Sequence, residues 1–350
     1  MPLIGRRFAI TAGSAVALLP LGAMAPLRPA EDTLEGTPIC RVADTAPAAP
    51  TGPLKKLRLT WNATAICTIG VPVASEQGFF ARHGLAVETI NFGGSTDQLL
   101  EAISTGKADA GVGMALRWLK PLEQGFDVKF TTGIHGGCMR LFGSAAGPIK
   151  TVADLRGRTL GCSDMGAPDK NFFSILAARQ GIDPARDITW RQFPADLLGV
   201  ALRKGEIEGF ALSDPLASVI RDRDALFEVA NNLSGEYAHR ACCVLGVRGA
   251  LIKEDRLAAA ALTRAILEAQ DWVVKHPDEA AAIFARNSPV PAAQLAAMLR
   301  SHTHHHHPTG EAFRQEIAAY TDELKLVQVI RANTNTARFA EKVTVDVLAT

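Results

Sequence analysis

Short apolar runs alternate with helix-length amphipathic stretches over most of this chain, and this alternation is the feature that most constrains its fold. Leu57–Trp61 has the composition of a buried strand, and Val71–His83 then carries apolar residues at helical spacing. Gly84 is suited to end that helix, and Val87–Phe92 is the next apolar run. Strands joined by crossover helices form largely parallel sheets. The pattern therefore predicts an α/β fold built from mostly parallel sheets flanked by helices.

The N-terminal segment differs from the rest of the chain. Arg6 and Arg7 precede an apolar run of small residues, which is the order of a secretion signal. The run contains Pro20 and is followed by no cluster of stop-transfer charges, which disfavours a membrane span. Residues 1–25 are therefore predicted to be a signal peptide of the twin-arginine or the general secretory type. Residues 26–56 are rich in proline and are predicted to form a linker.

The length of 350 residues suits about two lobes of ~100 to 150 residues each. Met139–Ser144 and Ala241–Arg248 are apolar runs that we interpret as strands where the chain crosses between the lobes. Lobe 1 is predicted to contain residues 57–147 and 241–350, and lobe 2 residues 148–240. Apolar stripes at helical spacing in the last third of the chain predict a helical C-terminal region.

A weak internal echo accompanies this division. Asp97, a helical stretch, Gly106 and a strand follow one another, and Asp196 and Gly205 repeat the order at the same spacing. The echo agrees with two lobes of the same build, but any strand–helix–strand unit needs similar punctuation. Both interpretations stay open at this point.

The charge of the chain limits its partners. It has 37 Lys and Arg against 36 Asp and Glu, for a formal net charge of +1. Proteins that bind nucleic acid carry a basic patch that follows the phosphates, often with interleaved aromatic residues. No such patch is evident after the N-terminus, so we expect no nucleic-acid partner.

Four segments of the chain resemble one known family. Thr151–Leu160 (TVADLRGRTL) is similar to the segment that opens the second lobe of the nitrate-, sulfonate-, taurine- and thiamine-precursor-binding proteins of ABC importers. Glu76–Val87, Leu100–Gly113 and Leu202–Asp214 are similar to further segments of that family, in the same order. The resemblance runs from Leu57 to Lys342, and it is specific for the superfamily rather than for a ligand.

The resemblance implies a two-lobed type II periplasmic-binding fold, in which two crossover strands join the lobes and a ligand lies in the cleft between them. It implies an exported, periplasmic, non-enzymatic protein that closes around a small polar or anionic molecule and delivers it to an importer permease in the inner membrane. Helix N-termini facing the cleft would supply N–H donors for such a ligand. We expect a monomer without a cofactor.

Loops at the carboxyl ends of strands line the ligand site in folds of this kind, so residues that follow the predicted strands are the candidate contacts. In lobe 1 these are Asn62, Thr64, Cys67, Gly94, Ser95, Thr96 and Met114, with His135 and Cys138 on the first crossover. In lobe 2 they are Ser163, Asp164, Met165, Gly166 and Asp214. Ser95 and Gln98 form a capping box that leaves backbone N–H groups beside Ser95. For any one hydroxyl, a plain helix cap is the alternative interpretation.

Two groups of residues favour a different ligand, a transition metal or a metal chelate. Cysteines occur at predicted strand ends and crossovers, namely Cys67, Cys138, Cys162, Cys242 and Cys243. Imidazoles that can coordinate a metal are concentrated in one run, at His302, His304, His305 and His306. Buried structural thiols or disulfides are the alternative for the cysteines, and a solvated loop between helices is the alternative for the histidines.

Two further classes of function stay open. The chain could be an enzyme on the same fold, either a relative of thiamine-pyrimidine synthases or a hydrolase that uses His135 and Cys138. These two residues are three positions apart on a strand-like segment and therefore face opposite sides, which disfavours a nucleophile and base pair. A sensor that reports cleft occupancy to a membrane kinase is the other class.

Overall fold

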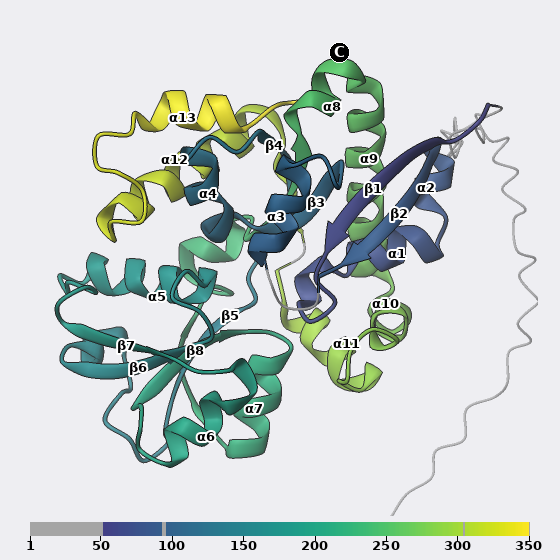
Figure 1. Cartoon of the computed structure of the whole chain (residues 1–350). Helices are drawn as coiled ribbons and strands as arrows, with labels where there is room; N and C mark the ends of the chain where they lie inside the picture. Colours follow the sequence, from purple (N-terminus) through teal and green to yellow (C-terminus); the bar gives the residue numbers. More distant parts are fainter. Residues whose placement is uncertain (1–51, 93–95, 304, 350) are drawn as a thin grey trace, which may run out of the picture. The chain divides into compact units, whose positions relative to one another are not determined.

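The computed structural model describes residues 52–92, 96–303 and 305–349. The predicted signal peptide, the linker up to residue 51, Gly94, Ser95 and His304 lie outside these ranges, and so does the side chain of Thr96. The described chain forms two five-stranded sheets with helices packed against them (Figure 1). None of the described helices is both long enough and apolar enough to cross a membrane.

The first sheet has the strand order β2-β1-β3-β10-β4. Its strands are β1 (Lys55–Trp61), β2 (Leu85–Asn91), β3 (Ala110–Met114), β4 (Val128–His135) and β10 (Cys243–Arg248). Between them the chain forms a 3-10 helix (Ile66–Thr68), α1 (Gly70–Glu76), α2 (Phe79–Arg82), α3 (Thr96–Ser104) and α4 (Ala115–Glu123). The single helix predicted from Val71 to His83 is split into α1 and α2. The reason is Gly78, whose φ of 71° is a left-handed conformation that interrupts a helix.

The second sheet has the strand order β7-β6-β8-β5-β9. Its strands are β5 (Met139–Gly143), β6 (Arg158–Cys162), β7 (Ile188–Gln192), β8 (Gly209–Ser213) and β9 (Phe227–Asn231). Its helices are α5 (Pro168–Arg179), α6 (Leu198–Arg203) and α7 (Leu216–Asp224), with 3-10 helices at Val152–Leu155, Ala195–Leu197 and Gly235–His239. Strand β5 pairs with β8 and β9, so it belongs to this sheet although the predicted boundary at residue 147 assigned it to lobe 1.

Both sheets are built in the same order. In the first sheet β1 pairs in parallel with β2 and β3, and in the second sheet β6 pairs in parallel with β7 and β8. A strand that arrives from the other sheet is inserted beside β3 in the first sheet and beside β8 in the second. These inserted strands, β10 and β5, are antiparallel to both of their neighbours. The predicted α/β fold is confirmed. The sheets are mixed rather than mostly parallel, because the inserted crossover strands run in the opposite direction to their neighbours. The common order also agrees with the internal echo in the sequence.

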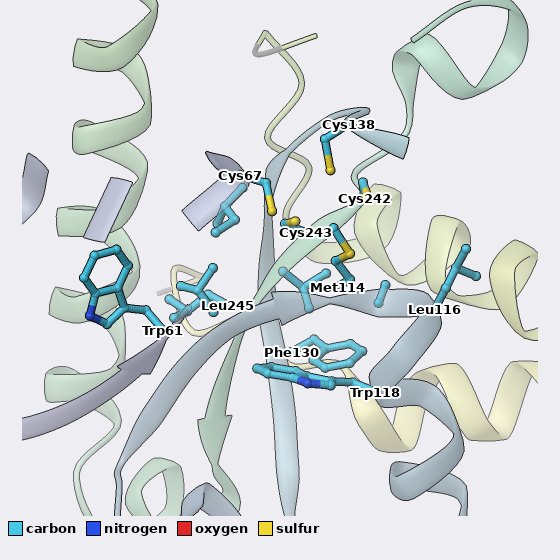
Figure 2. Packing of buried hydrophobic residues seen from close by; sticks show 14 of the residues in the cluster. Trp61, Cys67, Met114, Leu116, Trp118, Phe130, Cys138, Cys242, Cys243 and Leu245 are labelled. Carbon is cyan, nitrogen blue, oxygen red and sulfur yellow. The ribbon is translucent and has the colours of Figure 1, made fainter. Parts of the chain in front are cut away.

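Glycines in the centre of the first sheet make room for one large side chain. A Cβ atom at Gly113 on β3 would lie 2.2 Å from the Trp118 ring, and one at Gly246 on β10 would lie 2.8 Å from it. Trp118 from α4 is fully buried and stacks on Phe130 of β4, with ring centroids 6.2 Å apart (Figure 2). This packing fixes α4 against the sheet and positions the start of that helix, just after β3.

The last third of the described chain is helical, as predicted. Its helices are α8 (Gly249–Glu254), α9 (Arg256–Lys275), α10 (Pro277–Ala285), α11 (Ala292–Ser301), α12 (Gly310–Leu326) and α13 (Thr336–Val343). The long helix α9 begins at Asp255, whose carboxylate accepts a hydrogen bond from Ala258 N at 3.0 Å. It packs against α1 and α2 of the first sheet, whereas α12 contacts both α4 and α5 (Figure 1). The C-terminal region therefore touches the helices of both sheets.

Two connections join the sheets, at residues 136–138 and 232–242. Both ends of the second connection are hydrogen-bonded to the strands that flank the first: Cys242 N donates to His135 O at 2.8 Å, and Asn232 N donates to Met139 O at 3.2 Å. A Cβ atom at Gly137 would lie 2.3 Å from Asn232 O. The two crossings are therefore packed side by side, with a glycine where their backbones meet.

Candidate functional site

A cavity of about 520 Å³ is lined by residues from both sheets and their loops, and we call it the cleft. Its first wall consists of Asn62, Thr64, Ala65, Cys67, Thr68, Leu99, Val112, Gly113, Met114 and Arg117. Its second wall consists of Ser163, Asp164, Ala167, Pro168, Asp169, Ala195, Leu212, Ser213, Asp214 and Leu216. Cavities of this size suit small molecules. Because the cleft has one wall from each sheet, a ligand in it would touch both.

Seven of the predicted ligand contacts line the cleft: Asn62, Thr64, Cys67, Met114, Ser163, Asp164 and Asp214. Four others do not line it, namely His135, Cys138, Met165 and Gly166. His135 and Cys138 are fully buried in the first crossover, and Met165 is 49% exposed. Gly94 and Ser95 lie outside the described residues, and of Thr96 only the backbone is described, at the start of α3. The rule that strand-end loops meet in space therefore identified seven of the twenty residues in the described lining.

The loop after β1 forms the first wall through a local turn. Asn62 Oδ1 accepts hydrogen bonds from Thr64 N at 2.8 Å and from Thr64 Oγ1 at 2.7 Å. Thr68 Oγ1 donates to Asn62 O at 2.8 Å, which fixes the other end of the turn. Asparagine favours such turns because its side chain can accept from the backbone two residues further on. The turn leads into the 3-10 helix that carries Cys67.

An ion pair crosses from one wall of the cleft to the other. Arg117, on α4 beside the first sheet, donates to Asp164 Oδ1 in the loop after β6. Asp164 Oδ1 also accepts from Gly166 N at 2.7 Å. Partial burial opposes ionisation of Asp164, but these donors hold the pKa of its carboxyl below the ordinary value. Arg117 was not among the predicted site residues; it follows Met114 by three positions, nearly one helical turn.

Asp169 is a second cleft residue that the sequence analysis missed. It lies in the first turn of α5, and its side chain is buried at 3% exposure. Its carboxylate accepts hydrogen bonds from Lys170 N at 2.8 Å and from Ser213 Oγ at 3.2 Å. Burial raises the pKa of Asp169 to about 6. An acidic residue in the first turn of a helix ordinarily complements the helix dipole, so nothing in its local sequence distinguished it.

Asp214 is held differently, inside a buried polar network. It accepts from Arg140 Nε at 2.8 Å, from Ser218 Oγ at 2.6 Å and from His302 Nε2 at 2.8 Å. Arg140 also donates to Glu228 at 2.7 Å. Burial opposes ionisation, but the hydrogen bonds and nearby positive charges outweigh it and lower the pKa of Asp214 to about 2. Asp214 is therefore a permanently charged group whose partners are already in place.

The predicted metal site in the histidine run is not formed by the described residues. His302 is buried against Asp214, whereas His306 bonds to Glu316 on α12, and His305 is exposed. His304 lies outside the described ranges. Across the part of the chain that the structure describes, no group of three or more His, Cys, Asp or Glu could hold a metal ion. The reason is that His302 and His306 bond to different carboxylates, Asp214 and Glu316.

Four of the cysteines gather beside the cleft, and we call them the thiol cluster: Cys67, Cys138, Cys242 and Cys243 (Figure 2). All are buried free thiols that hydrogen-bond to one another, and the Met114 side chain lies beside them in Figure 2. Hydrogen bonds from Cys138 and Cys243 lower the pKa of Cys67 to about 6, and burial raises the pKa of Cys243 well above its ordinary value. Of the interpretations left open, buried structural thiols describe this cluster.

The hydrolase alternative requires His135 to act on Cys138. The Nδ1 atom of His135 instead lies 2.8 Å from Gly136 O, and the His135 and His302 rings form a T-shaped pair with centroids 5.4 Å apart. Both side chains are fully buried and neither lines the cleft. A catalytic pair needs access to substrate, so this geometry does not favour nucleophilic chemistry.

The fold is that of the periplasmic binding proteins. The periplasmic aliphatic sulphonate-binding protein SsuA of Escherichia coli superposes with a TM-score of 0.70 at 18% identity, covering 82% of this chain and 91% of that one. The periplasmic nitrate-binding protein NrtA of Synechocystis PCC 6803 superposes with a TM-score of 0.67 at 14% identity, covering 84% and 86%. These likenesses establish the architecture.

Residues 67–280 match the NMT1/THI5-like family, and the chain belongs to that family. The nitrate import ATP-binding protein NrtC of Synechocystis sp. is 25% identical over 217 residues, which is 57% of this chain and 32% of the relative. The chain thus spans about a third of the length of that curated relative.

Proposed function

We propose that this protein is the solute-binding component of an ABC importer, which captures a small polar molecule in the cleft and presents it to a permease in the inner membrane. The observation that carries the proposal is a cavity of about 520 Å³ with one wall from each of two similarly built sheets. Membership of the NMT1/THI5-like family and the likeness to two periplasmic binding proteins support it. In this proposal the protein binds its ligand without chemical change.

We also propose that the two sheets belong to separate lobes that close on the ligand by a hinge. Helix α5 of the second sheet and the loop before it make three contacts that opening would break. Asp164 in the loop bonds to Arg117, Asn171 Nδ2 of α5 donates to Leu116 O, and Arg179 of α5 bonds to Glu323 of α12. The two connections at residues 136–138 and 232–242 would stay paired. Few residues then need to change conformation, as is usual for hinge closure around a ligand.

The exported state follows from the same proposal. A binding component delivers its ligand to the outer face of an inner-membrane importer, so the protein works in the periplasm. The arginine pair and apolar run within residues 1–25 support export by an N-terminal signal. A protease-protection assay on spheroplasts, with a cytoplasmic enzyme as control, measures this directly.

A substitution that fills part of the cleft with a larger side chain tests the binding function. Ala195 lines the cleft and is partly exposed, so Ala195→Trp fills part of the cavity from its surface. Ala185 is exposed in the turn between α5 and β7 and does not line the cleft, so Ala185→Trp is the matched control. Dialysed proteins are mixed with a small-molecule extract of the producing cells, and thermal stabilisation is measured.

We expect the extract to stabilise the wild-type protein and Ala185→Trp and to leave Ala195→Trp unchanged. Bound molecules are then identified by native mass spectrometry. Equal stabilisation of Ala195→Trp would refute the cleft as the binding site. Conversion of the bound molecule into a product during the incubation would favour the enzyme alternative instead.

A further inference from the structure

The charged groups that line the described part of the cleft are one guanidinium, Arg117, and three carboxylates, Asp164, Asp169 and Asp214. Two of the carboxylates are matched by cations. Asp164 is paired with Arg117, and Asp214 is paired with Arg140 and lies against His302. The balance of charge in the cleft therefore depends on the remaining carboxylate.

Asp169 is held by neutral donors. Its hydrogen-bond donors are a backbone N–H, from Lys170, and the hydroxyl of Ser213. The ammonium of Lys170 lies over the Trp190 ring instead, 5.7 Å from its centroid. A carboxylate buried with uncharged partners lacks the counter-charge that normally compensates loss of water. A positive group entering the cleft would supply it.

Other parts of the cleft lining suit a hydrocarbon. Leu99, Val112, Met114, Leu212 and Leu216 contribute apolar side chains to the lining. An anion, by contrast, would meet an unmatched carboxylate, and the lining guanidinium is already engaged with Asp164. Both features favour a ligand with a positive head and an apolar body.

We propose, on the basis of the binding function proposed above, that the cleft selects a small organic cation whose protonated amine binds the Asp169 carboxylate. Ser213 then orients the carboxylate, and the hydrocarbon part of the ligand packs against the apolar residues of the lining. This assignment differs in charge from the sulphonate and nitrate in the names of SsuA and NrtA. The difference rests on this chain's own residues.

Fractionation by charge tests the proposal without knowledge of the ligand. The small-molecule extract of the producing cells is separated into material retained by a cation exchanger, material retained by an anion exchanger, and unretained material. Each fraction is added to the dialysed full-length protein, and the thermal shift is measured over a dilution series. We expect the fraction retained by the cation exchanger to stabilise the protein.

The isosteric variant Asp169→Asn removes the negative charge and keeps the shape of the side chain. A hydrogen bond to a charged group contributes about 1.5–3 kcal/mol. Asp169→Asn should therefore require roughly ten to a hundred times more of the cationic fraction than the wild type to reach a half-maximal thermal shift. Asp222, an exposed residue of α7 that does not line the cleft, provides the control Asp222→Asn, which should titrate like the wild type.

Each outcome decides between the two proposals. Stabilisation by the anionic or the unretained fraction alone would overturn the cationic ligand and leave the binding function standing. Stabilisation of Asp169→Asn at wild-type dilution would overturn the role of Asp169. If no fraction stabilises the wild-type protein, the binding function itself is refuted. The wild-type measurements do not depend on the folding of any variant.

Discussion

Replacing Asp169 by asparagine should make the protein more stable at neutral pH. In the unfolded chain this carboxyl has a pKa near 3.8, whereas burial raises its pKa to about 6 in the folded protein. Each factor of ten in proton affinity corresponds to about 1.4 kcal/mol, so ionisation costs the folded state about 3 kcal/mol at pH 7. The amide in Asp169→Asn avoids this cost, and it can keep both bonds by accepting from Lys170 N and donating to Ser213.

The sign of the effect follows from proton linkage. A raised pKa stabilises the folded protein fully below the unfolded pKa, and this contribution is lost as the pH rises through the folded pKa. The stability difference between Asp169→Asn and the wild type should therefore grow from about 2 kcal/mol at pH 5 to about 3 kcal/mol at pH 8. The groups that face Asp169 are Lys170, Ser213, Cys162 and Cys242, and they are the same in both proteins.

Urea unfolding at several values of pH, followed by circular dichroism, measures this difference. Asp222→Asn is the control, because the exposed Asp222 on α7 should change stability by less than about 0.5 kcal/mol at each pH. A loss of stability in Asp169→Asn at pH 7, or a difference that does not depend on pH, would refute the reasoning. A variant that is more stable but binds the cationic fraction less well would be the expected signature of a binding residue.

Three further predictions concern the crossovers and the groups beside them. Asp214→Asn should lower the free energy of unfolding by about 3–5 kcal/mol, because it leaves the buried Arg140 guanidinium without its counter-charge. A loss below about 1 kcal/mol in urea unfolding would contradict this. The thiol cluster should resist iodoacetamide in the native protein and react in urea, as read by mass spectrometry, because its members are at most 4% exposed; fast native labelling would show that the cluster is open. Gly136→Ala should lower the melting temperature, because its Cβ would lie 2.2 Å from Thr303 O. Gly52→Ala is the control and should leave the melting temperature unchanged, because a Cβ there meets open space. Equal melting temperatures of the two variants would exclude the clash.

Local pattern was sufficient for much of the architecture. The apolar run from Leu57 to Trp61 became part of β1, and seven of the fourteen predicted contacts lie in the lining of the cleft. Those seven come together because the carboxyl ends of parallel strands meet at one edge of a sheet, whatever the later course of the chain. The strand from Met139 to Gly143 was recognised as a strand, but its sheet was not, because pairing joins residues that are distant in sequence.

The sequence by itself determined an α/β chain with candidate contacts at the strand ends, because periodicity and turn residues act over a few positions. Only the tertiary structure decided which of those side chains carry unmatched charge. Asp169 and Asp214 are both acidic residues near strand or helix ends, yet burial raises the pKa of one to about 6 and a buried network lowers that of the other to about 2. Ionisation depends on the surroundings in space, and those come from segments far apart along the chain.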